Sequence, residues 1–322
     1  MTAPLVVRRA FVALLMASLC AVAVAGCGGQ APQPAKKDDE KKADPALTIP
    51  NPNDPKPAPK PEPKPPEGPP KSTLGAVEKD ADEFATAFRR DLIQGTAKID
   101  SLSPAFLKAV GKPWSFPGDD KAGYSTNNAA SFLNRVSQGV NFGLEIKREQ
   151  AGDVVYLRGA LQQPGGYCLR LVKAGGAWKV DWLSVSSVDA SSVTTTPTAE
   201  GAAQAFAVSA FVETLADLSD ARKDDRHLLL AAAMTKELRG KWAPLVFDQD
   251  RKLGYDYGPA KLATEAVKIG GKTTAYTASR VGDLPEFKVE LTKPGEKKAL
   301  TVKLEKGAGP NEWLVSDVIE AK

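Results

Sequence analysis

Residues 166–185 read GYCLRLVKAGGAWKVDWLSV, two short runs of apolar and aromatic residues separated by Gly175 and Gly176. Runs of this length, rich in β-branched and aromatic residues and joined by glycines, are typical of a β-hairpin. Two similar runs precede them at 143–150 and 153–162, bounded by Ala-Gly-Asp and Pro-Gly-Gly. The stretch 143–185 therefore predicts an antiparallel meander of four strands.

Helical patterns come before this meander. In residues 80–95, Phe84, Phe88 and Leu92 recur at steps of four, which predicts a helix with one apolar face. Ser103 suits the N-cap of a second helix, with Pro104 as its first residue and Gly111 as its end. A third helix is predicted to start near Asn127.

The remainder of the chain repeats the order of helices followed by strands. A long alanine-rich helix is predicted from Thr198, and a short helix capped by Thr235 and ended by Gly240 follows. Strands are then predicted at 263–269, 273–282, 286–293, 299–306 and 312–320. Helices first and strands afterwards, twice, predicts two α+β domains.

The spacing of the two segments supports an internal repeat. From Ser103 to Trp178 is 75 residues and from Thr235 to Trp313 is 78, and each tryptophan opens the last strand. Two unrelated α+β domains with similar spacing remain the alternative. A Ser/Thr-rich stretch at 186–198, without an apolar period, predicts the boundary between the domains.

The order of a long helix, a short helix entered through Leu-Ser-Pro-Ala-Phe, and a sheet ending in Trp-x-Val resembles the NTF2-like (cystatin-like α+β cone) domains of bacterial envelope lipoproteins. The resemblance implies tandem NTF2-like domains at 73–190 and 199–322, joined by a linker at 191–198. It covers 76–190 and 199–321. That superfamily holds both enzymes and binding modules, so the fold alone does not decide the function.

The N-terminus reads as an export signal. Arg8 and Arg9 precede an apolar run over 10–25, which is shorter than the about 20 residues that a membrane-spanning helix needs. The end of the run, Val-Ala-Gly-Cys at 24–27, resembles the lipobox of bacterial lipoprotein precursors. This resemblance implies a signal peptide over 1–26, cleavage between Gly26 and Cys27, and attachment of fatty acyl chains such as palmitate at Cys27. An ordinary cleavable signal with an incidental cysteine is the alternative.

A proline-rich segment follows Cys27. Residues 28–72 contain 14 prolines, no aromatic residue, and only Leu47 and Ile49 as large aliphatics. Such a composition cannot bury enough apolar surface to offset the entropy of ordering. We expect 27–72 to be a lipidated cysteine followed by a disordered tether, with a PxxP ligand for an SH3-like partner as the alternative.

The charge balance argues against a nucleic-acid binder, and the cysteine content argues against an internal disulfide. After residue 72 the chain carries 33 basic and 32 acidic residues, which lacks the basic excess of a nucleic-acid binder. Cys20 lies in the signal and Cys27 would be acylated, so Cys168 is alone and no internal disulfide is available.

Signals for catalysis are weak. His227 is the only histidine, and at a helix start after Asp224 and Asp225 it is expected to be solvated. No motif predicts a metal or a cofactor. Trp178 and Trp182, four apart, are expected on one face of a strand. The residues expected to line a cone pocket, if one is open, are Tyr156, Tyr167, Trp178, Tyr276 and Trp313.

The sequence therefore predicts a membrane-anchored envelope lipoprotein, not an enzyme, that binds an envelope protein or a small apolar ligand and no nucleic acid. The alternatives are an isomerase or cyclase working in a cone pocket, and a structural spacer or adhesin. Gly28, rather than an aspartate, follows the anchor, which favours the outer membrane in a Gram-negative host. The domains would face the periplasm or the exterior.

Overall fold

The computed structural model describes residues 74–112, 126–138, 140–189, 192–218 and 226–321. All of them belong to one compact unit, residues 64–322. The predicted signal peptide, Cys27 and the predicted tether lie outside the described residues. Within these ranges, no helix is long and apolar enough to cross a membrane.

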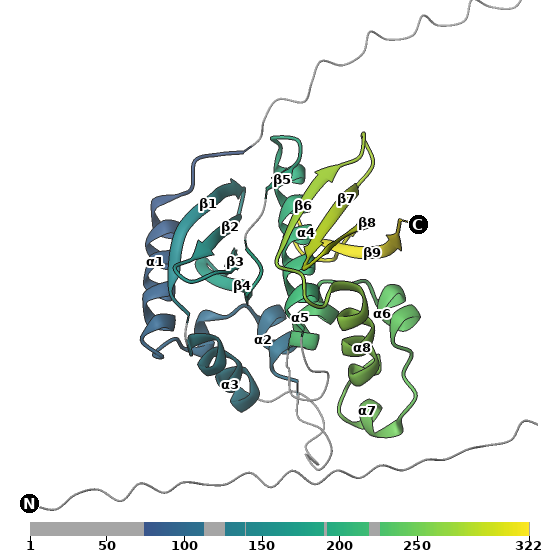
Figure 1. The fold of residues 1–322 in the computed structure, drawn as a ribbon. Coiled ribbons are helices and arrows are strands. Elements are labelled where there is room, and N and C mark those ends of the chain that lie inside the picture. Colours follow the sequence, from purple (N-terminus) through teal and green to yellow (C-terminus); the bar gives the residue numbers. More distant parts are fainter. Residues whose placement is uncertain (1–73, 113–125, 139, 190–191, 219–225, 322) are drawn as a thin grey trace, which may run out of the picture. The chain divides into compact units, whose positions relative to one another are not determined.

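The first half is built from helices followed by four strands (Figure 1). These elements are α1 (Lys79–Ile93), the 3-10 helix η1 (Ile99–Ser101), α2 (Pro104–Val110), α3 (Thr126–Ser137), β1 (Phe142–Ala151), β2 (Val154–Leu161), β3 (Gly166–Ala174) and β4 (Ala177–Ser186).

The second half begins with the short strand β5 and then also has helices followed by four strands (Figure 1). It contains β5 (Val193–Thr194), α4 (Ala199–Asp217), α5 (Arg226–Ala232), α6 (Lys236–Trp242), α7 (Asp248–Lys252), α8 (Pro259–Gly270), β6 (Ala275–Arg280), β7 (Glu286–Lys293), β8 (Glu296–Lys306) and β9 (Trp313–Glu320).

The strands form two sheets in simple order. Sheet A has the order β1-β2-β3-β4, and every neighbouring pair is antiparallel, as the turn signals predict. Sheet B has the order β5-β6-β7-β8-β9 and is antiparallel except for the short β5, which pairs parallel to β6. The fold is therefore α+β with antiparallel sheets covered by helices.

The central strands of sheet A are buried on both faces, whereas the edge strand β1 is partly exposed. Tyr167, Leu169 and Leu171 of β3 point to one face, where Arg89 of α1 donates from Nη1 to the Tyr167 hydroxyl across 3.1 Å. Cys168, next along the strand, points to the opposite face and donates from Sγ to Glu213 of α4. Helices from both halves of the chain thus cover sheet A.

Sheet B alternates between buried and solvent-facing positions. Along β7, Phe287, Val289 and Leu291 are buried, whereas Lys288 between them is exposed. This period of two is typical of a sheet with one face against helices and the other in water.

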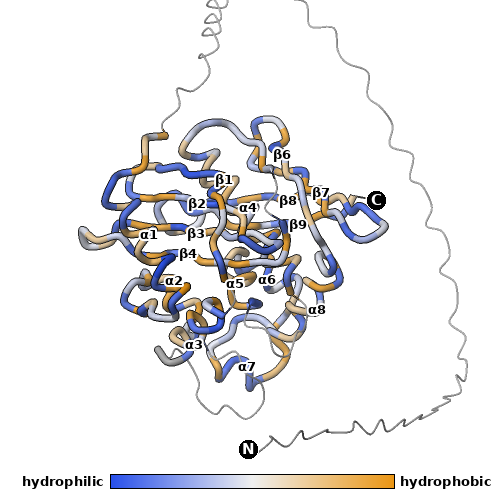
Figure 2. The backbone as a smooth tube through the Cα atoms, turned by 60° about the vertical axis from the view of Figure 1, so that its left-hand side comes forward, coloured by the Kyte–Doolittle hydropathy of each residue, from blue (hydrophilic) through white to orange (hydrophobic). Residues whose placement is uncertain are grey.

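Helix α4 lies between the two sheets and contacts strands of both (Figure 2). Every residue from Gly201 to Asp217 is buried, so the helix has no exposed face. Its composition is mostly apolar and rich in alanine, which is typical of a core position and lets neighbours approach closely. Its buried polar side chains, among them Ser209, Glu213 and Asp217, are hydrogen-bonded to the elements around it. Thr198 caps it by accepting from the backbone N–H of Gly201 across 3.0 Å.

Local features of the first half recur in the second. The backbone N–H of Ser103 donates to the Val180 carbonyl (2.7 Å), and that of Thr235 donates to the Val315 carbonyl (2.8 Å). Both residues also cap the helix that follows, as predicted. A lysine lies over the tryptophan that opens each last strand, 5.3 Å from the Trp178 ring centroid and 5.6 Å from that of Trp313.

Both last strands also carry a bulge three residues after that tryptophan. The register of β4 skips Asp181, and that of β9 skips Ser316. A bulge reverses the alternation of side chains beyond it. Trp182 therefore faces away from the side of sheet A that Trp178 occupies, and the expectation that they share one face is wrong.

Two elements differ from the sequence-based prediction. Residues 263–269, predicted as a strand, belong to helix α8, where Leu262, Ala263 and Ala266 are buried along one face. The β-branched residues of this segment suggested a strand, but packing of the apolar face against α4 decides the outcome. Gly240, predicted to end a helix, lies inside α6, whose C-cap is Ala243.

Candidate functional site

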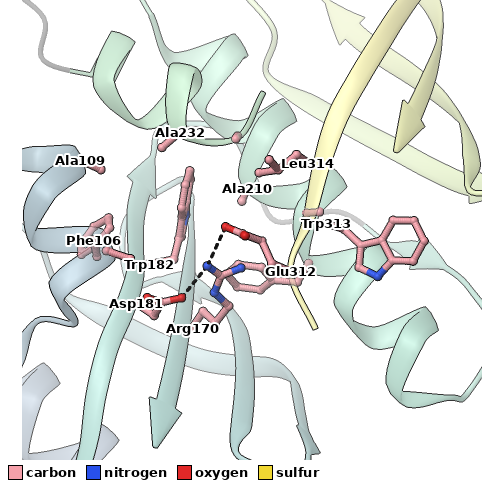
Figure 3. Close-up of a pocket in the computed structure, with 14 residues that line it drawn as sticks. Phe106, Ala109, Arg170, Asp181, Trp182, Ala210, Ala232, Glu312, Trp313 and Leu314 are labelled. Carbon is pink, nitrogen blue, oxygen red and sulfur yellow. Dashed lines mark hydrogen bonds and ion pairs between the residues drawn. The ribbon is translucent and has the colours of Figure 1, made fainter. Parts of the chain in front are cut away.

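A small cavity of about 70 Å³ lies where helices of both halves meet the bulge of β4. Its walls are largely apolar and rich in alanine (Figure 3). The lining residues are Ala105, Phe106, Ala109, Arg170, Asp181, Trp182, Phe206, Ala207, Ala210, Ala232, Ala233, Glu312, Trp313 and Leu314.

Arg170 forms the charged end of this cavity. Its Nη2 lies 2.5 Å from Asp181 Oδ2 and 3.8 Å from Glu312 Oε1, as the dashed lines in Figure 3 show. Asp181 also accepts a hydrogen bond from the Ser103 hydroxyl. Only 12% of the Arg170 side chain is exposed. Two carboxylates therefore compensate the guanidinium charge and leave a local excess of one negative charge.

Arg170 has one donor left over. Its Nε is buried and has no hydrogen-bond acceptor among the residues that the structure describes. A buried donor without an acceptor destabilises a fold by about 1–3 kcal/mol. Arg170 lines the cavity, but this atom is itself closed off from water-sized molecules, so it can take an acceptor from outside the chain only if the side chain moves.

A wider groove of about 620 Å³ shares Glu312 and Trp313 with the cavity. Most of its lining residues have polar side chains, although apolar atoms make up the larger part of the surface, and they come from the end of the 186–198 segment, the start of α4 and the turns of sheet B. Charged side chains of the groove are hydrogen-bonded to other groove residues: Arg280 donates to the Thr196 hydroxyl (3.0 Å), and Glu312 accepts from the Gly309 N–H (2.8 Å).

The predicted pocket residues do not gather at one site. Tyr156 donates to the Asn311 carbonyl (2.9 Å), Tyr167 lies on the opposite face of sheet A, and Trp178 lies under Lys173. Tyr276 donates to Glu213 across 3.0 Å in the core. Among the five, Trp313 is the one that lines both the cavity and the groove.

The sequence reasoning missed Arg170 and Glu312 as site residues. The available signal was an arginine in the middle of a strand that otherwise reads as core. A charge in such a position needs a partner, but the partner Glu312 lies more than a hundred residues away along the chain.

His227 is buried, with none of its surface exposed, so the expectation of a solvated histidine is wrong. Its Nδ1 lies 3.3 Å from the Tyr257 hydroxyl, and the Tyr255 ring is 5.9 Å away. Burial, with a smaller contribution from the Lys112 charge, lowers the pKa of His227 to about 3. Within the described part of the chain, no cluster of three or more His, Cys, Asp and Glu side chains could hold a metal ion.

Comparisons with known proteins add little. No family model matches the chain, and no curated protein matches its sequence. Among solved structures, the chain is similar to a cystatin-like protein from Ruminococcus gnavus ATCC 29149, with 9% identity over 76% of this chain and 93% of that chain. The TM-score is 0.17, and likeness of that degree says nothing about function.

Proposed function

We propose that the chain is an envelope lipoprotein, acylated at Cys27, whose folded part binds a ligand without chemical turnover. The N-terminal pattern supports the anchor: a basic start, a short apolar run, small residues before a cysteine, and 45 proline-rich residues after it. The anchor holds the chain at a membrane, and residues 28–72 separate the folded part from the lipid.

The folded part is proposed to consist of tandem NTF2-like halves. The recurrent caps, lysine–tryptophan contacts and bulges support this reading, because two unrelated α+β folds have no reason to share them at matching positions. The halves share the buried helix α4, so they act as one body.

The observation that carries the binding proposal is the alanine-lined cavity with the cluster of Arg170, Asp181 and Glu312 at its charged end. Because Asp181 and Glu312 already neutralise the guanidinium, an additional carboxylate would be repelled. The acceptor expected here is an uncharged oxygen, a carbonyl or hydroxyl, on a short apolar group that fits alanine-lined walls. A small molecule and a peptide segment entering from the groove both offer this chemistry.

The residues at the cavity give less support to a catalytic function. A general base needs a lone pair directed at the substrate. The two carboxylates at the cavity face Arg170, and one of them also accepts from Ser103. They hold the arginine in position, which is the role expected in a binding site.

The anchor is tested by expressing the full chain in a bacterium that processes lipoproteins and supplying an alkynyl fatty acid. We expect the label on the wild type to be lost in Cys27→Ser, which leaves the membrane fraction. Cys168→Ser is the matched control and should keep the label. A Cys27→Ser variant that stays labelled would rule out the anchor.

Binding is tested by native mass spectrometry of the full chain carrying Cys27→Ser, with and without envelope extract. We expect an added mass in the parent chain that Ala207→Leu abolishes by filling the cavity. Ala260→Leu, on the exposed side of α8, is the control. An added mass of small-molecule size identifies a small ligand, and a protein-sized one identifies a peptide-bearing partner. An addition that survives Ala207→Leu, or none at all, contradicts binding in the cavity.

A further inference from the structure

Glu213 of α4 is hydrogen-bonded to both sheets at once. Its Oε1 accepts from the Tyr276 hydroxyl of β6 across 3.0 Å, and its Oε2 accepts from the Cys168 thiol of β3 across 3.3 Å. The side chain is 1% exposed. A single carboxyl group therefore connects sheet A, the central helix and sheet B.

Among the described residues, Arg158 is the positive charge that acts on Glu213 most directly. Arg158 of β2 donates from Nη1 to Ser209 across 2.9 Å, one turn before Glu213 on α4. Its charge attracts the ionised carboxylate, and Asp217, one turn later, repels it. Asp217 itself is paired with Arg226 at 2.7 Å. The groups facing Glu213 are thus Cys168 and Arg158 from sheet A, Tyr276 from sheet B, and Asp217 from its own helix.

Burial is the largest influence on this carboxyl group. It raises the pKa of Glu213 from 4.5 to about 7, although the hydrogen bonds from Cys168 and Tyr276 and the charge of Arg158 act in the opposite direction. A solvated glutamate has its ordinary pKa. At a pH between these two pKa values, any opening that hydrates Glu213 therefore releases its proton.

We propose that the contact of sheet A with α4 at Glu213 is a joint controlled by a proton. While the carboxyl group is neutral, sheet A stays packed against α4. Once the group is ionised, the two separate more often. The inference does not depend on the proposed function. Since the closed state binds the proton more tightly than the open state, closure is strongest at acidic pH. It weakens as the pH rises through neutrality.

Cys168 reports this opening because its thiol is buried against Glu213 and reacts only when the joint opens. The experiment uses the full chain with Cys20→Ser and Cys27→Ser, which leaves Cys168 as the only thiol, and measures alkylation rates from pH 5 to 8. Dividing by the rates of the same chain with Glu213→Gln removes the intrinsic pH dependence of the thiol. We expect this ratio to rise roughly 70-fold over the range.

Amide hydrogen exchange of the unsubstituted chain gives a second readout that does not require the Glu213→Gln variant to fold. After correction for intrinsic rates, amides of β3 and α4 should exchange faster as the pH rises, whereas the β7–β8 ladder of sheet B should not. A flat alkylation ratio overturns the proposal. Equal acceleration in both sheets also overturns it, since that pattern reports global unfolding and no joint.

Discussion

Ser103 and Val180 connect the start of α2 to the last strand of sheet A: the backbone N–H of Ser103 donates to the Val180 carbonyl across 2.7 Å. The same serine caps α2, accepting from the Phe106 N–H across 3.0 Å, and its hydroxyl bonds to Asp181 beside the cavity. Ser103 thus forms hydrogen bonds to α2, to the last strand of sheet A and to Asp181 beside the cavity.

Ser103→Ala should destabilise the protein by about 1–2 kcal/mol, because it removes the N-cap and leaves Asp181 with one hydrogen bond fewer. Urea denaturation measures the change. Ser137→Ala removes a half-exposed hydroxyl that donates to the Asn134 carbonyl, and it should change the unfolding free energy by less than about 0.5 kcal/mol. Equal effects of the two substitutions would contradict the role given to Ser103.

Gly159→Ala and Gly240→Ala should have opposite effects. A Cβ at Gly159 would lie 2.4 Å from the Tyr167 ring, so alanine there should cost about 1–3 kcal/mol of unfolding free energy. At Gly240, inside α6, a Cβ meets nothing within 4 Å, and alanine should stabilise the helix by about 0.5–1 kcal/mol. Thermal denaturation of both variants checks the signs, and a destabilising Gly240→Ala would place that residue outside a helix.

His227 should make the protein sensitive to acid. Its pKa is about 3 in the folded state, below the ordinary 6.5, so the unfolded chain binds the proton first and stability falls as the pH drops from 6.5 toward 3. The groups that face it are Lys112, Tyr255 and Tyr257. At pH 4 the loss due to His227 is roughly 3 kcal/mol.

The measurement compares unfolding free energies at pH 7 and pH 4 for the wild type and for His227→Gln. Glutamine does not titrate, so the difference between the two pH values should shrink by that amount, whatever the substitution does to stability at pH 7. An unchanged difference would mean that His227 is hydrated in the folded protein.

Arg170→Met should destabilise the protein by about 2–3 kcal/mol, since Asp181 and Glu312 would then face each other without their shared cation. Adding Asp181→Leu should recover part of the loss. Lys303→Met is the control: Lys303 precedes the bulge of sheet B, and its pair with Glu286 is half-exposed, so its removal should cost at most about 0.5 kcal/mol. Denaturant titration of all variants gives the comparison.

The parts of the fold that the sequence predicted are those set by neighbours along the chain. Ser103, Pro104 and Gly111 define α2 through its own backbone groups, and glycine pairs define the hairpins. Residues 263–269 were misread because their strand-like composition is overridden by burial against α4, which is distant in sequence.

The candidate site was harder to predict for the same reason. His227 gains its burial from Tyr255 and Tyr257, thirty residues later, and Arg170 finds Glu312 in the other half. The bulge at Asp181, which turns Trp182 toward the cavity, has no signature in the composition of β4. Side chains brought together by the packing of two sheets leave no periodic pattern in either segment.

The position of α4 also bears on the order of events during synthesis. Sheet A is complete at Ser186, but the helix that covers the face carrying Cys168 ends only at Asp217. A chain made from its N-terminus therefore presents an unfinished apolar surface until some thirty further residues have emerged. Release or proteolytic cutting between the halves would leave that surface in water, and we expect such fragments to aggregate rather than persist as folded domains.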